Sequence, residues 1–197
     1  IVVRHSECGL PESLKEYVDC PIINAGDGKH SHPTQALLDL FTIYEHFNGQ
    51  TQGKKLAIVG DVRNSRVAGS NRRLLPRFGI EVNLVAPDCF KYESDDFKQY
   101  NNIREIIDEL DIIMSLRSQL ERHNLTYFES LNEYAKDYCI TNELVGDRDI
   151  ILLHPGPVNR NIDISDEMLK DPRSKVLTQV TNGVAIRAAI LKKLILK

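Results

Sequence analysis

The chain has 197 residues, of which 42% are hydrophobic and 27% are charged, and 25 basic and 28 acidic side chains give a net charge of −3. This composition is ordinary for a soluble globular domain, and the mixed charges form neither a basic stripe for nucleic acid nor an acidic tail. The longest apolar runs are too short to span a bilayer. Four cysteines lack metal-ligand or redox spacing, so we expect reduced thiols, a cytoplasmic location, no nucleic-acid partner and no membrane segment.

Short apolar runs alternate with stretches of helical periodicity along the chain. The predicted strands are Ile1–Arg4, Pro21–Asn24, Lys55–Gly60, Glu81–Ala86, Asp111–Ser115, Tyr138–Ile140 and Ile150–His154. The predicted helices are Pro11–Val18, Pro33–Phe47, Arg66–Phe78, Ile103–Glu109, Ser130–Lys136 and Val184–Leu196. This alternation is typical of βαβ units and predicts an α/β fold with a doubly wound parallel sheet.

The chain begins inside an apolar run without the charged or small-residue pattern of a signal peptide, so we interpret it as a fragment that lacks its N-terminal part. The helix that opens at Pro33 is followed by a polar loop and then by the first strand of a new sheet. We therefore expect two lobes. Residues 1–34 are predicted to be the remnant of a first lobe, residues 35–178 a complete second lobe, and residues 179–197 a C-terminal helix that packs back on the first lobe.

Ligands of open α/β sheets bind beyond the carboxyl ends of the strands. The predicted strand exits carry arginine or histidine, among them Arg4, Arg66 and Arg117. Because the arginine fork matches carboxylate or phosphate groups, this pattern predicts a polyanionic small molecule. A nucleotide-binding oxidoreductase domain is the competing interpretation. The turn Gly60–Ser65, however, lacks the glycine spacing through which a backbone approaches a pyrophosphate, which argues against NAD.

The segment His30–Asp39, with the sequence HSHPTQALLD, resembles the signature of the carbamoyltransferase family, in which histidine, proline and glutamine open the helix that joins two lobes. Four further segments resemble successive parts of aspartate carbamoyltransferases, in the family's order: Asn64–Ala68, Leu116–Arg122, His154–Pro157 and Gln179–Arg187. The resemblance covers essentially the whole chain, and five matched segments in order are far more specific than any one of them.

The resemblance implies transfer of the carbamoyl group of carbamoyl phosphate to the amine of L-aspartate, which yields N-carbamoyl-L-aspartate and phosphate early in de novo pyrimidine biosynthesis. The ornithine-specific relatives place a cysteine in the segment that here reads His154–Pro157, and this chain has none there. A dicarboxylate acceptor also calls for arginines, which favours the aspartate-type reaction. No metal or organic cofactor is implied.

The site residues follow from the matched motifs. The resemblance implies that Arg4 and His32 stabilise the developing oxyanion as catalytic residues. Carbamoyl phosphate is expected to bind to Arg4, His32, Gln35, Pro155, Gly156 and Pro157, and L-aspartate to Arg66, Arg117 and Gln119. The family pattern further suggests a cis peptide bond between Gly156 and Pro157. Gly69 has no assigned role, although glycine inside a helix costs about 1 kcal/mol relative to alanine.

Two elements of the family have no counterpart in this sequence. They are a serine-threonine-arginine-threonine run that binds phosphate and a lysine-bearing loop that a neighbouring subunit contributes; both would lie upstream of Ile1. We therefore expect the 197-residue chain to be nearly inactive and the full chain to be active as a homotrimer with shared active sites. The resemblance also allows regulatory chains as partners. The alternatives are an ornithine-type carbamoyltransferase and a non-catalytic carbamoyltransferase-like scaffold.

Overall fold

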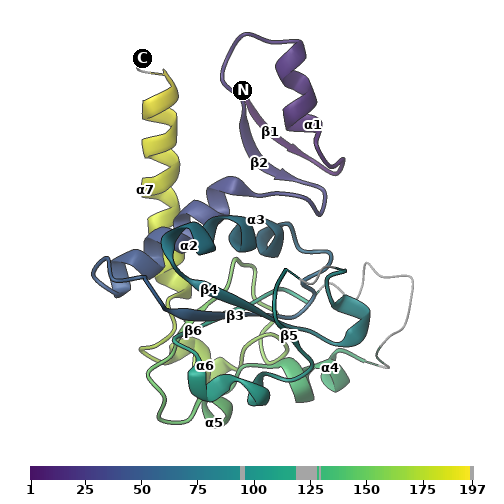
Figure 1. Cartoon of the computed structure of the whole chain (residues 1–197), viewed down its shortest axis with the longest axis vertical. Helices are drawn as coiled ribbons and strands as arrows, with labels where there is room; N and C mark the ends of the chain where they lie inside the picture. The colour runs from purple at the N-terminus through teal and green to yellow at the C-terminus, as the bar shows by residue number, and fades with distance from the viewer. Residues whose placement is uncertain (94–95, 119–127, 129, 196–197) are drawn as a thin grey trace.

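The computed structural model describes residues 1–93, 96–118, 128 and 130–195. Within these residues the chain forms a two-stranded parallel sheet and a five-stranded parallel sheet. Figure 1 shows the small sheet at one end of the molecule and the large sheet at the other, with helices between them. The predicted α/β fold, with one complete doubly wound lobe and the tail of another, is confirmed.

The small sheet belongs to the first 27 residues. Strand β1 (Val2–His5) pairs with β2 (Ile23–Asp27). Helix α1 (Leu10–Ser13) and a 3-10 turn (Leu14–Glu16) connect the two strands. Strand β2 therefore lies further along the chain than predicted, and the predicted helix Pro11–Val18 is reduced to one short helical segment and a turn.

The large sheet has the strand order β5-β4-β3-β6-β7. The strands are β3 (Lys55–Val59), β4 (Glu81–Val85), β5 (Gln99–Tyr100), β6 (Ile112–Ser115) and β7 (Ile151–Leu153). The chain moves outward from β3 to β4 and β5, and then returns to the other side of β3 for β6 and β7. The direction of winding therefore changes between β3 and β6, which is where ligands of doubly wound folds bind.

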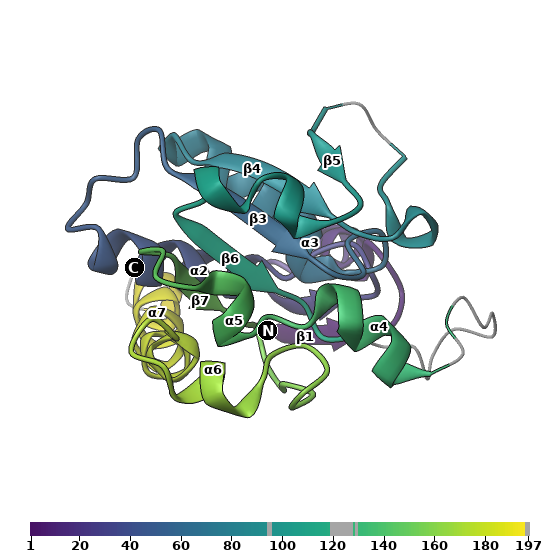
Figure 2. The same cartoon turned by 90° about the horizontal axis from the view of Figure 1, so that it is seen from below.

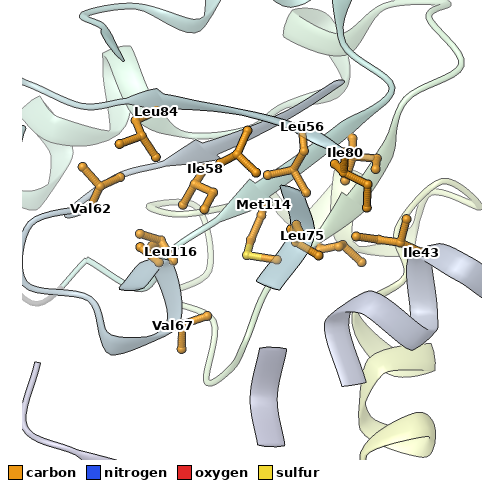
Figure 3. Packing of buried hydrophobic residues seen from close by; sticks show 14 of the residues in the cluster. Ile43, Leu56, Ile58, Val62, Val67, Leu75, Ile80, Leu84, Met114 and Leu116 are labelled. Atoms are coloured by element: carbon orange, nitrogen blue, oxygen red, sulfur yellow. The ribbon is translucent and has the colours of Figure 1, made fainter. Parts of the chain in front are cut away.

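Both faces of the large sheet are buried. Leu56 and Ile58 point to one face, where they pack with Met114 under α2 and α3, as Figure 3 shows. Ala57 and Val59 point to the opposite face. Because a parallel sheet is covered on both sides, its strands are nearly continuous apolar runs, and this is why the sequence revealed most of them.

The α-helices that follow α1 in the described chain are α2 (Pro33–His46), α3 (Arg66–Leu74), α4 (Leu131–Tyr138), α5 (Asn142–Val145), α6 (Asp166–Lys170) and α7 (Val176–Ile195). Helix α2 agrees with the prediction to within one residue. Helix α3 ends before the predicted Phe78 and continues as a 3-10 turn, Leu75–Phe78, because Pro76 cannot donate a helical hydrogen bond. The structure contains no described helix long and apolar enough to cross a membrane.

Two further predictions of secondary structure were wrong, and several short elements were missed. The predicted strand Tyr138–Ile140 is the end of α4 followed by an isolated bridge from Ile140 to Ile164. The predicted helix Ile103–Glu109 forms two 3-10 turns, Ile103–Glu105 and Ile107–Glu109. The short elements β5, α5 and α6, and the 3-10 turn Asp88–Phe90, were not predicted, because they are too short for a periodic pattern.

Helix α7 begins at Val176, eight residues before the predicted start at Val184. Asn182, which precedes the predicted start of this helix, lies inside α7 and donates hydrogen bonds to Thr42 and Glu45 of α2 at 3.1 Å each. These tertiary contacts offset the weak helix propensity of the Asn-Gly pair. Figures 1 and 2 show that α7 crosses α2 and extends from the large sheet toward the small one.

Candidate active site

A polar cleft of about 330 Å³ opens where the small sheet, α2, α3 and the carboxyl ends of the large sheet meet. Its lining residues are Arg4, Gly28, His32, Gln35, Asn64, Ser65, Arg66, Val67, Leu116, Arg117, Pro155, Gly156, Pro157 and Arg187. Four are arginines and, among the described lining residues, none is acidic. A cleft with this excess of positive charge attracts a ligand that carries several negative charges.

The structure brings together eight of the nine predicted site residues. Arg4, His32, Gln35, Arg66, Arg117, Pro155, Gly156 and Pro157 all line the cleft. The ninth, Gln119, lies outside the described residues. The central expectation, that arginines from separate strand exits meet at one place, is therefore met by the geometry, while the role of each residue remains a proposal.

Arg66 and Arg117 flank the point at which the winding of the sheet changes direction. Arg117 lies two residues after β6, and Arg66 begins α3, whose N-cap Ser65 accepts a hydrogen bond from the Ala68 amide at 3.2 Å. The guanidinium of Arg66 lies directly over Gly26, where a β-carbon would approach Arg66 Cζ to 3.0 Å. Glycine at this position therefore leaves room for the arginine side chain.

His32 lies at the N-terminus of α2 and is 9% exposed. Its backbone amide donates to Ser70 Oγ at 2.7 Å, and its Nδ1 lies 3.4 Å from the Thr34 hydroxyl. Burial, together with the positive charges of Arg66 and Arg4, lowers the pKa of His32 to about 4. The imidazole is therefore neutral near pH 7. If Nδ1 accepts from Thr34, the ring has one N–H, on Nε2, to donate to a ligand.

Gln35 lies one turn further along α2 and is 6% exposed. Its Nε2 donates to Asp39 Oδ1 at 2.9 Å. Because an ionised carboxylate only accepts hydrogen bonds, the amide nitrogen must face Asp39. The side-chain oxygen of Gln35 is then left for the cleft, as an acceptor.

The turn after β7 is held by the buried side chain of His154. Its Nδ1 accepts a hydrogen bond from the Gly156 amide at 2.9 Å, and its Nε2 lies 3.2 Å from Asp163 Oδ2. The Gly156–Pro157 peptide bond is cis, as predicted. Pro155 and Gly156 line the cleft, where their backbone carbonyls can accept hydrogen bonds.

Arg187 is the arginine of the described cleft lining that the sequence analysis did not assign. It comes from α7, one turn after Gly183, where a β-carbon would approach Arg187 Nη1 to 2.5 Å. Glycine at 183 therefore lets the arginine side chain lie against its own helix and reach the cleft. The available signal was the matched segment Gln179–Arg187, which ends on this residue.

Gly69 has a structural explanation, although it does not line the cleft. A β-carbon at this position would approach the backbone carbonyl oxygen of His30 to 2.7 Å. Backbone atoms cannot move aside as the end of a side chain can. Glycine therefore permits the close approach of α3 to the segment that leads to His32.

The fold is that of an α/β protein with an arginine-rich cleft between its small and large parallel sheets. The family description "Aspartate/ornithine carbamoyltransferase, Asp/Orn binding domain" matches residues 52–194, and "Aspartate/ornithine carbamoyltransferase, carbamoyl-P binding domain" matches residues 1–45. The chain belongs to the aspartate/ornithine carbamoyltransferase family.

Individual relatives are similar over the whole chain. An aspartate carbamoyltransferase catalytic subunit of Aliarcobacter butzleri is 84% identical over 196 residues, which cover 100% of this chain and 66% of the relative. The catalytic subunit of M. jannaschii aspartate transcarbamoylase superposes with a TM-score of 0.84 at 35% identity, covering 99% of this chain and 66% of that one. Aspartate transcarbamoylase from Trypanosoma cruzi, in complex with carbamoyl aspartate and phosphate, gives 0.82 at 30% identity, with 96% and 63% covered. The chain thus spans about two thirds of the length of these relatives.

Proposed function

We propose that this chain carries most of the active site of an aspartate carbamoyltransferase, which transfers the carbamoyl group of carbamoyl phosphate to the amine of L-aspartate. The observation that supports this proposal most strongly is the convergence of Arg4, Arg66, Arg117 and Arg187 on one cleft, together with His32. Carbamoyl phosphate and aspartate together carry several negative charges, and the cleft supplies a matching set of guanidinium groups.

The carbamoyl group is proposed to lie between Arg4, His32 and Gln35. During attack by the amine, negative charge develops on the carbamoyl oxygen. A neutral His32 N–H and the Arg4 guanidinium are donors for that oxygen, and one such donor is worth about 3 kcal/mol in other acyl transfers. The carbamoyl NH2 needs acceptors, which Gln35 Oε1 and the Pro155 carbonyl supply.

Aspartate is proposed to be held by Arg66 and Arg117, with Gln119 in support. Two arginines bind two carboxylates, and the amine is thereby aimed at the carbamoyl carbon. Pinning both substrates makes the reaction effectively intramolecular. The ornithine-type alternative is less favourable, because the cationic side chain of ornithine would enter a cleft that already contains four arginines.

The assembly and setting of the protein are further parts of this proposal. The family resemblance supports a cytoplasmic enzyme of pyrimidine biosynthesis that forms a homotrimer with shared active sites. We keep the lobe boundaries of the sequence analysis, with residues 1–34 and 179–197 in or against the carbamoyl-phosphate lobe and residues 35–178 as the aspartate lobe.

Titration calorimetry with two bisubstrate analogues tests the proposal on a full-length chain that contains these residues. N-phosphonoacetyl-L-aspartate is expected to bind far more tightly than its ornithine counterpart. Arg117→Ala should weaken binding by about 100-fold, since a charge-assisted bidentate contact contributes about 3 kcal/mol. Arg104→Ala, an exposed change on a 3-10 turn remote from the cleft, is the matched control. Preference for the ornithine analogue, or equal binding of both, would refute the assignment of aspartate.

A further inference from the structure

A buried carboxylate lies directly behind the cleft. Asp39 is 0% exposed, yet it does not line the cleft and has no role in the proposed mechanism. Three side-chain amides donate hydrogen bonds to it: Gln35 Nε2 at 2.9 Å, Asn71 Nδ2 at 2.8 Å and Gln179 Nε2 at 2.8 Å. They come from α2, α3 and α7, so one side chain joins the three helices that surround the site.

Each of the three hydrogen bonds determines which way an amide points. A carboxylate offers only acceptors, so Gln35 and Gln179 must both turn their NH2 groups toward Asp39. The oxygen of Gln35 then faces the cleft. The oxygen of Gln179 accepts a hydrogen bond from the backbone N–H of His154 at 2.8 Å, and His154 directly precedes Pro155.

We propose that Asp39 is a positioning residue that makes the cleft selective for an amide, because it orients both acceptors for the carbamoyl NH2, the Gln35 side chain directly and the Pro155 backbone through Gln179. This inference rests on the proposed function. Asp39 touches no substrate and acts only through these two groups. Without it, Gln35 could rotate and present its own NH2 to the substrate NH2, donor against donor.

The surroundings of Asp39 support a polar role rather than a general packing role. The carboxylate has no ion-pair partner within contact distance among the described residues, and burial raises its pKa to about 6 while the amides of Asn71, Gln179 and Gln35 lower it. Arg187 on α7 is the charged group that also lowers this pKa. A buried group that merely filled space would not require a carboxylate at this energetic disadvantage.

The test compares two stable ligands that differ only at the group in question. Phosphonoacetamide has an NH2 where acetonylphosphonate has a methyl group, and both carry the same carbonyl and phosphonate. Affinities are measured by calorimetry on the full-length protein. In Asp39→Ala the preference for phosphonoacetamide over acetonylphosphonate should fall by about tenfold, equivalent to about 1.4 kcal/mol, while acetonylphosphonate binding stays within about threefold.

Two variants separate positioning from general damage. Asp39→Asn should keep the preference, because Asn71 can rotate and offer its Oδ1, which is buried without a hydrogen-bond partner, to the new amide. Thr42→Val is the matched control. It removes another buried contact between α2 and α7, the hydrogen bond from Asn182 to Thr42 Oγ1, without touching Gln35. It should lower stability and leave the preference unchanged.

A double variant adds a second criterion. Gln35→Ala should lose part of the same preference, and Asp39→Ala in that background should add less than it does alone, because only its effect through Gln179 and Pro155 is left to lose. If Asp39→Ala does not fold, Asp39→Ser is used in its place, because serine keeps a polar atom in the buried site. Equal weakening of both ligands, or an unchanged preference in folded Asp39→Ala (or in Asp39→Ser, where that variant is used instead), would overturn the inference. Failure of the proposed function would appear earlier, as a wild-type protein that does not bind phosphonoacetamide.

Discussion

Replacement of Asp39 by asparagine should raise the stability of the protein at neutral pH and not at acid pH. In the folded state burial raises the pKa of Asp39 to about 6, from an unfolded value of 3.8. The protonated form is therefore favoured by folding. The contribution of protonated Asp39 to the free energy of unfolding is complete below pH 3.8, and it is lost as the pH rises through about 6. A shift of about two pKa units corresponds to about 3 kcal/mol, and full burial leaves little solvent screening to reduce it.

Asparagine has the same shape and no ionisable proton, so the difference in unfolding free energy between Asp39→Asn and wild type isolates this contribution from all other titrating groups. Between pH 4.5 and pH 7.5 the difference should grow by about 2 kcal/mol in favour of the variant. Urea unfolding at fixed protein concentration measures it, provided that the dependence on urea is the same for both proteins. A difference that is constant with pH, or that shrinks toward neutral pH, would refute the reasoning.

Two substitutions and one titration test the geometry. Gly69→Ala should destabilise the protein by about 1–3 kcal/mol, despite better helix propensity, because the new methyl group meets the His30 carbonyl; a gain in thermal stability would contradict this. Gly26→Ala, at φ +117°, should lower thermal stability by about 1–2 kcal/mol and displace Arg66, which would appear as a raised KM for aspartate with little change for carbamoyl phosphate. The His32 ring should stay neutral down to about pH 4, which an NMR titration can follow; protonation near pH 6.5 would show that burial and Arg66 do not act as described.

Local sequence pattern determined much of the fold. The strands β3, β4, β6 and β7 can be recognised in the sequence as apolar runs, because a parallel sheet buries both faces of its strands. Helix α2 can be recognised in the sequence because a proline begins it and apolar residues recur with the helical period. The matched segments also identified seven residues that the structure brings to one cleft, and the exit of the first predicted strand identified the eighth, Arg4. For each of these, the information lies within a few neighbouring residues.

Other features depend on contacts between distant segments, and only the tertiary structure decided them. In the second turn of α7, Asn182 is held by Thr42 and Glu45 of α2, a contact that the local sequence pattern does not reveal. The oxygen of Gln35 faces the cleft because its NH2 group donates to the Asp39 carboxylate. Another partner of that carboxylate, Gln179, lies 140 residues further along the chain. Arg187 reaches the cleft only because α7 crosses α2. Sequence alone supplies the chemical groups and the short-range elements, whereas the direction in which a buried amide or arginine points is set by packing between helices that are remote in the chain.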